Sequence, residues 1–217
     1  QSTVLLELKE ESQTWHFDRI PERPIPSLLR DFSAPVIVEY PWNQEDLAIL
    51  CAHDSNPFAR WEAVQALSSN ELLRIAARLA QDKQPELDPA LLQVWKTNLT
   101  DPNLDAGYRA WLLTLPSEKV LAERMTPIEP VAIAKARDFV REELANGLLD
   151  LWQQTLSQNE TPGPYSPDAI SAGRRSLKNL ALAYLLSIQS PPAIQAAFAQ
   201  YQNAGNMTDR IGALSAL

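Results

Sequence analysis

The chain has 217 residues, of which 45% are hydrophobic and 21% charged, and this balance is typical of a folded protein rather than a disordered one. Its net charge of −8 argues against a general nucleic-acid-binding surface, which needs clustered positive charge to replace phosphate counterions. The apolar runs are too short to predict a transmembrane segment, no secretion signal is recognisable at the start, and a single cysteine excludes an intrachain disulfide, so we expect a cytoplasmic protein.

The first 40 residues predict extended chain. Their β-branched and aromatic content predicts short strands over residues 4–9, 14–18 and 35–40, and the prolines at positions 21, 24 and 26 argue against helix between the second strand and the third. Three strands are marginal on their own. We therefore expect them to complete a sheet that begins earlier in a longer polypeptide.

Helical periodicity replaces this pattern from Asn43 onward. Apolar residues recur at helical spacing through eight or nine segments, with a break near residues 68–70, one long helix from Pro130 to about Leu151, and a loop over 159–167. Capping residues or an early proline mark the helix starts: Asn43, Asn56, Asp88, Ser117, Pro130, Asp168, Ser190 and Asn206. Such a series packs as side-by-side hairpins in an α-solenoid, although no sequence repeat of fixed period is present.

Candidate catalytic and metal-binding residues are sparse. Zinc hydrolysis typically needs two histidines and a carboxylate at helical spacing, and neither His16 nor His53 has such a neighbour. Cys51 lies on an amphipathic helix without an activating base, which predicts a buried structural thiol. We therefore predict no catalytic residue and no metal ligand in this sequence.

The remaining charged and polar candidates favour structural roles. The adjacent pairs Glu10-Glu11 and Glu142-Glu143 are expected on solvated faces, because neighbouring residues of a helix point in different directions. Arg174, Arg175 and Lys178 form a basic cluster, for which a solvated helical stripe is favoured over a phosphate site. The Asn-x-Thr sequons at positions 98, 159 and 206 are read as chance matches.

Four of the six tryptophans, Trp61, Trp95, Trp111 and Trp152, lie on apolar helix stripes, which predicts core packing rather than ligand stacking. The last residues, 211–217, read as an apolar helix without a polar cap. Natural termini are usually polar. We therefore expect a piece of a longer protein: the end of a β domain followed by part of a helical superstructure.

Several motifs, in order, resemble the bacterial aminopeptidase N family of zinc metallopeptidases. Residues 56–63, Asn-Pro-Phe-Ala-Arg-Trp-Glu-Ala, are similar to the family's Asn-x-Phe-x-Arg-Trp-x-Ala. Further similar segments occur in the same order as in the family, so that the resemblance extends over essentially the whole chain: residues 24–36, 113–118, 130–133, 174–179 and 206–209.

The resemblance implies a mostly α fold, with residues 1–42 as the end of a small β-sandwich domain and 43–217 as the first part of a helical C-terminal domain. In the family, the helical domain helps to enclose the active-site chamber of an enzyme that removes N-terminal residues from peptides. The implied partners are the catalytic and N-terminal domains of the same polypeptide, and peptide substrates. The family's zinc motif, His-Glu-x-x-His with a later Glu, is absent here, so zinc is expected in the parent enzyme and this fragment is expected to be inactive.

A different class stays open at this point, namely a free-standing helical-repeat scaffold that binds a protein partner on a concave surface. It predicts a polar capping helix at the end of the chain, which the sequence does not show. An unrecognised enzyme built on these residues alone has the least support, because no nucleophile, base and oxyanion donor cluster in the sequence.

Overall fold

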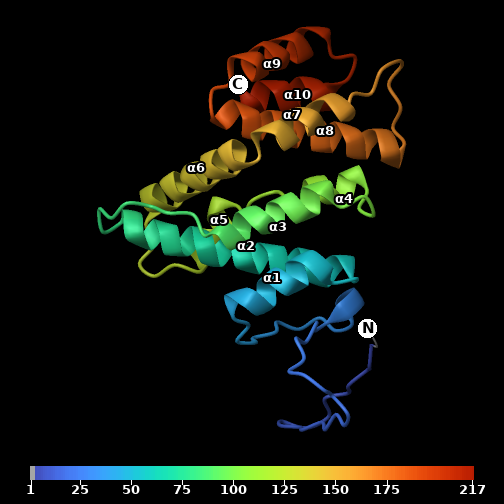
Figure 1. Ribbon diagram of the computed structural model, residues 1–217, viewed down its shortest axis with the longest axis vertical. Coiled ribbons are helices and arrows are strands. Elements are labelled where there is room, and N and C mark those ends of the chain that lie inside the picture. The colour runs from blue at the N-terminus through green and yellow to red at the C-terminus, as the bar shows by residue number, and fades with distance from the viewer. Residues whose placement is uncertain (1–2) are drawn as a thin grey trace.

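The computed structural model describes residues 3–217, and its helices are stacked along the long axis broadly in chain order, with α10 between α8 and α9 (Figure 1). This arrangement confirms the predicted helical stack. The α-helices are α1 (Gln44–His53), α2 (Pro57–Leu79), α3 (Pro89–Thr100), α4 (Ala106–Leu112), α5 (Glu118–Glu123), α6 (Pro130–Gly147), α7 (Leu149–Gln158), α8 (Ala169–Ser187), α9 (Pro191–Asn203) and α10 (Met207–Ala216).

The helix starts are set by local side-chain chemistry. Six predicted capping residues each accept a hydrogen bond from a backbone N–H two or three positions later, and such a cap typically stabilises a helix by about 1 kcal/mol. These residues are Asn43, Asn56, Asp88, Ser117, Asp168 and Asn206. Asp105 caps α4 in the same way, although the sequence reading did not single it out.

Two predictions about helix continuity are wrong. Helix α2 continues through residues 68–70, where Ser68 and Ser69 are buried and the Ser68 hydroxyl donates to the Val64 carbonyl one turn earlier. The long helix predicted after Pro130 instead divides at Leu148, whose φ of −125° is not helical. Gly147 ends α6 where a Cβ would come within 2.7 Å of the Leu92 side chain.

The strands predicted over residues 4–9, 14–18 and 35–40 are not formed within the described part of the chain. Residues 3–43 are extended and irregular, with one short 3-10 turn, η1, at Arg30–Phe32. A strand is stabilised by hydrogen-bonded neighbours and by burial of one face. Ile37, which is 94% exposed, shows that this burial is missing here.

Polar contacts nevertheless hold this segment against the first helices. The Arg30 guanidinium lies 2.7 Å from a carboxylate oxygen of Asp54, which follows α1. The side-chain amide of Asn56 donates to the Asp31 carboxylate at 2.5 Å while its oxygen caps α2. Residues of two resembling motifs, 24–36 and 56–63, are thus bonded to each other.

The core is continuous from α1 to α10 and centres on Tyr184 of α8. The Tyr184 hydroxyl accepts from the Trp95 indole N–H and donates to the Leu113 carbonyl, both at 3.0 Å, and its ring stacks on Trp152 with centroids 4.3 Å apart. Burial raises the pKa of this phenol. Trp95 and Trp152 are fully buried, which confirms their predicted place in the core.

Helices α4 and α8 cross in direct backbone contact. A Cβ on Gly173 would lie 2.7 Å from the backbone nitrogen of Gly107, closer than real Cβ contacts allow. Glycine at both positions therefore sets how closely the two helices approach.

Candidate functional site

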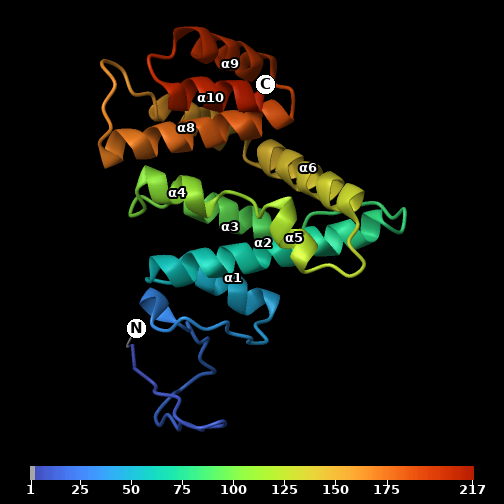
Figure 2. The ribbon, with the colours of Figure 1, turned by 180° about the vertical axis from the view of Figure 1, so that it is seen from behind.

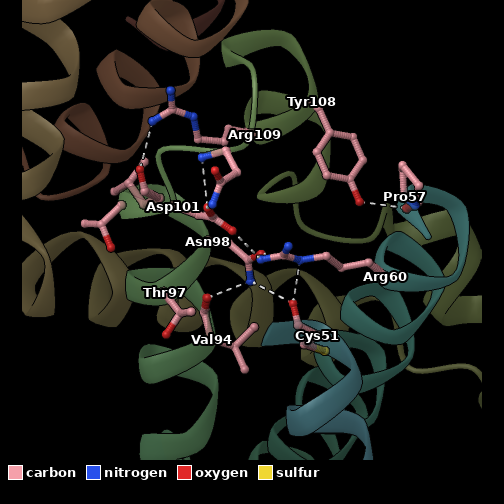
Figure 3. A network of polar contacts seen from close by, with 12 residues as sticks. Cys51, Pro57, Arg60, Val94, Thr97, Asn98, Asp101, Tyr108 and Arg109 are labelled. Carbon is pink, nitrogen blue, oxygen red and sulfur yellow. Dashed lines mark hydrogen bonds and ion pairs between the residues drawn. The ribbon is translucent and has the colours of Figure 1, made fainter. Parts of the chain in front are cut away.

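A buried polar network joins α1, α2 and α3 around Arg60 (Figure 3). The Arg60 Nε donates to the carbonyl of Cys51 at 2.9 Å and to Oδ1 of Asn98 at 3.0 Å. Its Nη2 donates to the Asp101 carboxylate at 3.2 Å. The side-chain amide nitrogen of Asn98 donates in turn to the carbonyls of Cys51 and Val94. The guanidinium is thus occupied by protein acceptors, which gives it a structural role.

Burial and hydrogen bonding in this network also shift the pKa values of two groups within it, the Asp101 carboxyl and the Cys51 thiol. Burial alone would raise the pKa of Asp101, but hydrogen bonds from the Asn103 N–H and from Arg60 outweigh it and lower that pKa. Burial raises the pKa of the Cys51 thiol, which confirms the predicted buried structural cysteine. Asn98 is fully buried, so its sequon lies inside the fold.

An aromatic cluster extends from this network to the surface. Trp61 of α2 and Trp111 of α4 stack with centroids 4.5 Å apart and planes 3° apart, and Phe58 and Tyr108 lie beside them. The Tyr108 hydroxyl donates to the Pro57 carbonyl at 2.7 Å, and burial raises the pKa of Tyr108 to about 12. Trp111 is 50% exposed, so its predicted place in the core is wrong.

A concave site with several charged residues lies at the C-terminal end of the stack. We call it the α8 cavity: a space of about 650 Å³ between the loop 159–168, α8, and the turn from α9 to α10. These elements lie together in both ribbon views (Figures 1 and 2). The charged residues that line it are three cations and two carboxylates: Arg174, Arg175, Lys178, Glu160 and Asp209.

The basic cluster of α8 is therefore not the solvated stripe that was predicted. Arg174 is exposed, but Arg175 and Lys178 are each only 3% exposed. The loop 159–168 and helix α10 fold over them. The spacing of residues along α8 alone cannot predict this burial, because it depends on segments outside that helix. Lys178 has a buried partner, because its ammonium lies 3.0 Å from the Asp209 carboxylate.

Arg175 has weaker partners. Its Nη2 donates to the carbonyl of Ser166 at 2.9 Å, and its guanidinium lies 4.8 Å from the centre of the Tyr165 ring. Among residues 3–217 no carboxylate forms an ion pair with it, and its buried Nε has no hydrogen-bond acceptor.

The histidines are not brought together by the fold. His16 lies in the exposed N-terminal segment and His53 at the end of α1. Within the part of the chain that the structure describes, no group of three or more His, Cys, Asp or Glu side chains is arranged to hold a metal ion. The paired glutamates at 10–11 and 142–143 are exposed. Across residues 3–217, no helix has both the length and the apolar character needed to cross a bilayer.

Two family models match the chain. Residues 44–217 match a domain of unknown function, DUF3458_C, described as ARM repeats, and residues 1–41 match the DUF3458 domain, described as an Ig-like fold. The helical match agrees with the stack of α1–α10, and the second match concerns the segment whose predicted strands are not formed here.

The chain is also similar to named proteins. It is 33% identical to aminopeptidase N of Escherichia coli over 212 residues, and 34% identical to that of Haemophilus influenzae over 211 residues. These alignments cover 98% and 97% of the chain but 24% of each relative. A crystal structure of Legionella pneumophila aminopeptidase A in complex with aspartic acid matches with a TM-score of 0.78 and 32% identity, over 92% of this chain and 24% of that one.

The chain thus spans about a quarter of the length of the relatives it matches, in their C-terminal part. Motif order, helical architecture and sequence identity agree: the chain belongs to the DUF3458_C family of ARM-repeat domains and is a C-terminal fragment of the aminopeptidase N family.

Proposed function

We propose that this chain is a non-catalytic region of a zinc-dependent, cytoplasmic aminopeptidase that removes N-terminal residues from peptides. Residues 1–42 form the end of a small β-sandwich domain, and residues 43–217 form the first part of the helical domain. The helical part helps to enclose the active-site chamber and limits which substrates enter. Enclosure of this kind restricts access and excludes water from the reaction.

The observation that carries the proposal is the alignment of nearly the whole chain to one region of aminopeptidase N at 33–34% identity. This match supports the aminopeptidase over the free-standing scaffold considered from the sequence. The exposed apolar side chains of residues 3–43, Leu5 and Ile37 among them, also suit a segment that packs against further protein.

The residues present do not fit a zinc site. Zinc hydrolases hold the metal with three protein ligands that converge on one point. His16 and His53 lie on separate elements, and no cluster of ligands surrounds either within residues 3–217. The proposal therefore places the zinc, the catalytic groups and the chemistry elsewhere in the parent polypeptide.

Activity and zinc content test the first half of the proposal. We expect the parent polypeptide to hydrolyse an aminoacyl p-nitroanilide and to contain zinc by atomic absorption. The isolated chain should show neither activity nor stoichiometric zinc. Hydrolysis or stoichiometric zinc in the purified chain would overturn the non-catalytic assignment.

A comparison of folded and unfolded substrates tests the access role. One small disulfide-bonded protein is offered to the parent polypeptide in its native form and in its reduced, alkylated form, which has the same N-terminus. We expect release of the N-terminal residue from the unfolded form only. Equal rates on both forms would contradict a chamber that limits access.

A further inference from the structure

The α8 cavity contains a buried positive charge that the protein does not neutralise. A charged side chain taken out of water is normally paired with an opposite charge, because its desolvation is otherwise uncompensated. Lys178 obeys this rule through Asp209. Arg175, which is 97% removed from solvent, has only a carbonyl and an aromatic ring as partners among the described residues 3–217.

The geometry of Arg175 points to the kind of group that is missing. An arginine presents Nε–H and one Nη–H side by side, and this fork fits the two oxygens of a carboxylate or a phosphate. Here Nε has no acceptor, and Nη2 has one bond, to Ser166. The Tyr165 ring covers one face of the guanidinium, with its centre 4.8 Å from Cζ.

The charges around the cavity allow such a ligand. Glu160 and Asp209 line it, and each has one oxygen facing the Lys178 ammonium, at 3.8 and 3.0 Å, while the other oxygen of Asp209 is buried without a hydrogen-bond donor among residues 3–217. Arg174 adds a further positive charge at the exposed side. The cavity therefore has one more positive than negative charge, although the chain as a whole carries −8.

We propose that the α8 cavity binds a small oxyanion, a carboxylate or a phosphate, on the fork of Arg175, with Arg174 and Lys178 adding electrostatic attraction. A volume of about 650 Å³ is large enough for an amino-acid-sized or phosphate-bearing molecule.

Calorimetric titration of the full chain at constant ionic strength tests this site, with two probes and sodium chloride as the reference anion. N-acetylglycine supplies a carboxylate without a free amino group, and inorganic phosphate supplies the other oxyanion. We expect saturable binding of at least one probe and none of chloride. Binding of N-acetylglycine alone identifies a carboxylate ligand, and binding of phosphate alone identifies a phosphate-bearing one.

Variants show whether Arg175 holds the anion. R175Q should weaken binding at least tenfold, and R175K should bind with intermediate affinity because it keeps the charge but loses the fork. R124Q removes an exposed arginine of the α5 end, remote from the cavity, and should leave the affinity unchanged.

Two results would overturn the proposal. One is the absence of saturable binding by both probes in the wild-type chain, a result that does not depend on how any variant folds. The other is an unchanged affinity in R175Q or R175K whose circular dichroism matches that of the wild type.

Discussion

Arg60 lies where α1, α2 and α3 meet, and its guanidinium bonds to Cys51, Asn98 and Asp101 from one position. Each of these acceptors is already fixed by its own helix. A single side chain therefore sets the distances between three elements.

Replacement of Arg60 by Met should destabilise the chain strongly. Asn98 Oδ1 would lose its donor in a site without solvent, and Asp101 would lose its counter-charge. A buried acceptor left without a donor costs about 1–3 kcal/mol, so with the lost ion pair we expect about 3 kcal/mol less free energy of unfolding in urea. The control R124M should change it by less than about 0.5 kcal/mol. If R60M and R124M lowered the free energy of unfolding equally, the buried network around Arg60 would not stabilise the fold more than an exposed arginine does.

The Cys51 thiol should be inert in the folded chain. Burial raises its pKa, so the reactive thiolate is nearly absent at pH 8, whereas an unfolded cysteine ionises near pH 8.5. A thiol with a raised folded pKa stabilises the fold below the unfolded pKa, and that contribution is lost as the pH rises above it. We expect no reaction with a disulfide reagent at pH 8 and one thiol per chain in 6 M guanidinium. Rapid labelling of the native chain would contradict the burial.

How far the sequence predicts such residues depends on how local their partners are. Asn56 is predictable as a cap because its partner lies three positions away. Arg175 is not predictable as buried, because Tyr165, Ser166 and α10 surround it only after the loop 159–168 has folded back. The aromatic stripe likewise gives no sign that Trp111 remains half exposed.

At the scale of elements, the crossing of α4 and α8 depends on two glycines rather than on side-chain interlock. A helix interior disfavours glycine by about 1 kcal/mol relative to alanine. The close backbone approach explains both glycines: a Cβ on Gly173 would lie 2.7 Å from the backbone nitrogen of Gly107, and a Cβ on Gly107 would make a tight contact of 3.3 Å with the Cα of Gly173.

Gly173→Ala should therefore destabilise the chain despite the better helix propensity of alanine. The added Cβ would meet backbone atoms of Gly107 that cannot move as a flexible side chain does. Overpacking of this kind costs about 1–3 kcal/mol. Gly205→Ala is the matched control, since a Cβ there meets nothing within 4 Å. Thermal unfolding checks both variants, and a G173A chain as stable as G205A would show that the crossing can relax.

Helix boundaries were predictable where capping side chains mark them. They were much less predictable where contacts with other helices determine where a helix ends. The division at Leu148 follows a close contact between Gly147 and Leu92 of α3, residues 55 positions apart. The continuity of α2 through two serines and an asparagine shows the opposite case, in which packing overrides weak local propensity.

For the whole molecule, apolar surface is concentrated at the two ends of the stack. Leu5 and Ile37 are exposed at one end, and Phe198, Ile211 and Leu214 at the other. The strand prediction was local and lacked the neighbours that a sheet needs. The helical prediction succeeded because each helix finds a packing partner within the described chain.

The isolated chain should therefore bind a hydrophobic dye and associate as its concentration rises. Exposed apolar area of this kind is unfavourable in water and is reduced by self-contact. We expect enhanced anilinonaphthalene sulfonate fluorescence, and a sedimentation coefficient that increases with concentration. A strictly monomeric chain without dye binding would show that these ends are not effective apolar patches.

The order of the helices in space broadly follows their order in the chain, except that α10 lies between α8 and α9 (Figure 1). During synthesis, α1 and α2 can pair as soon as they leave the ribosome, whereas α4 and α7 gain their main packing partner, α8, only after it has been made. Assembly can thus begin in the direction of translation, but α4 and α7 are fully packed only once α8 is present. The Tyr184 hydroxyl bonds to Leu113 and Trp95, which precede it by 71 and 89 positions. These two hydrogen bonds can therefore form only once α8 has been made.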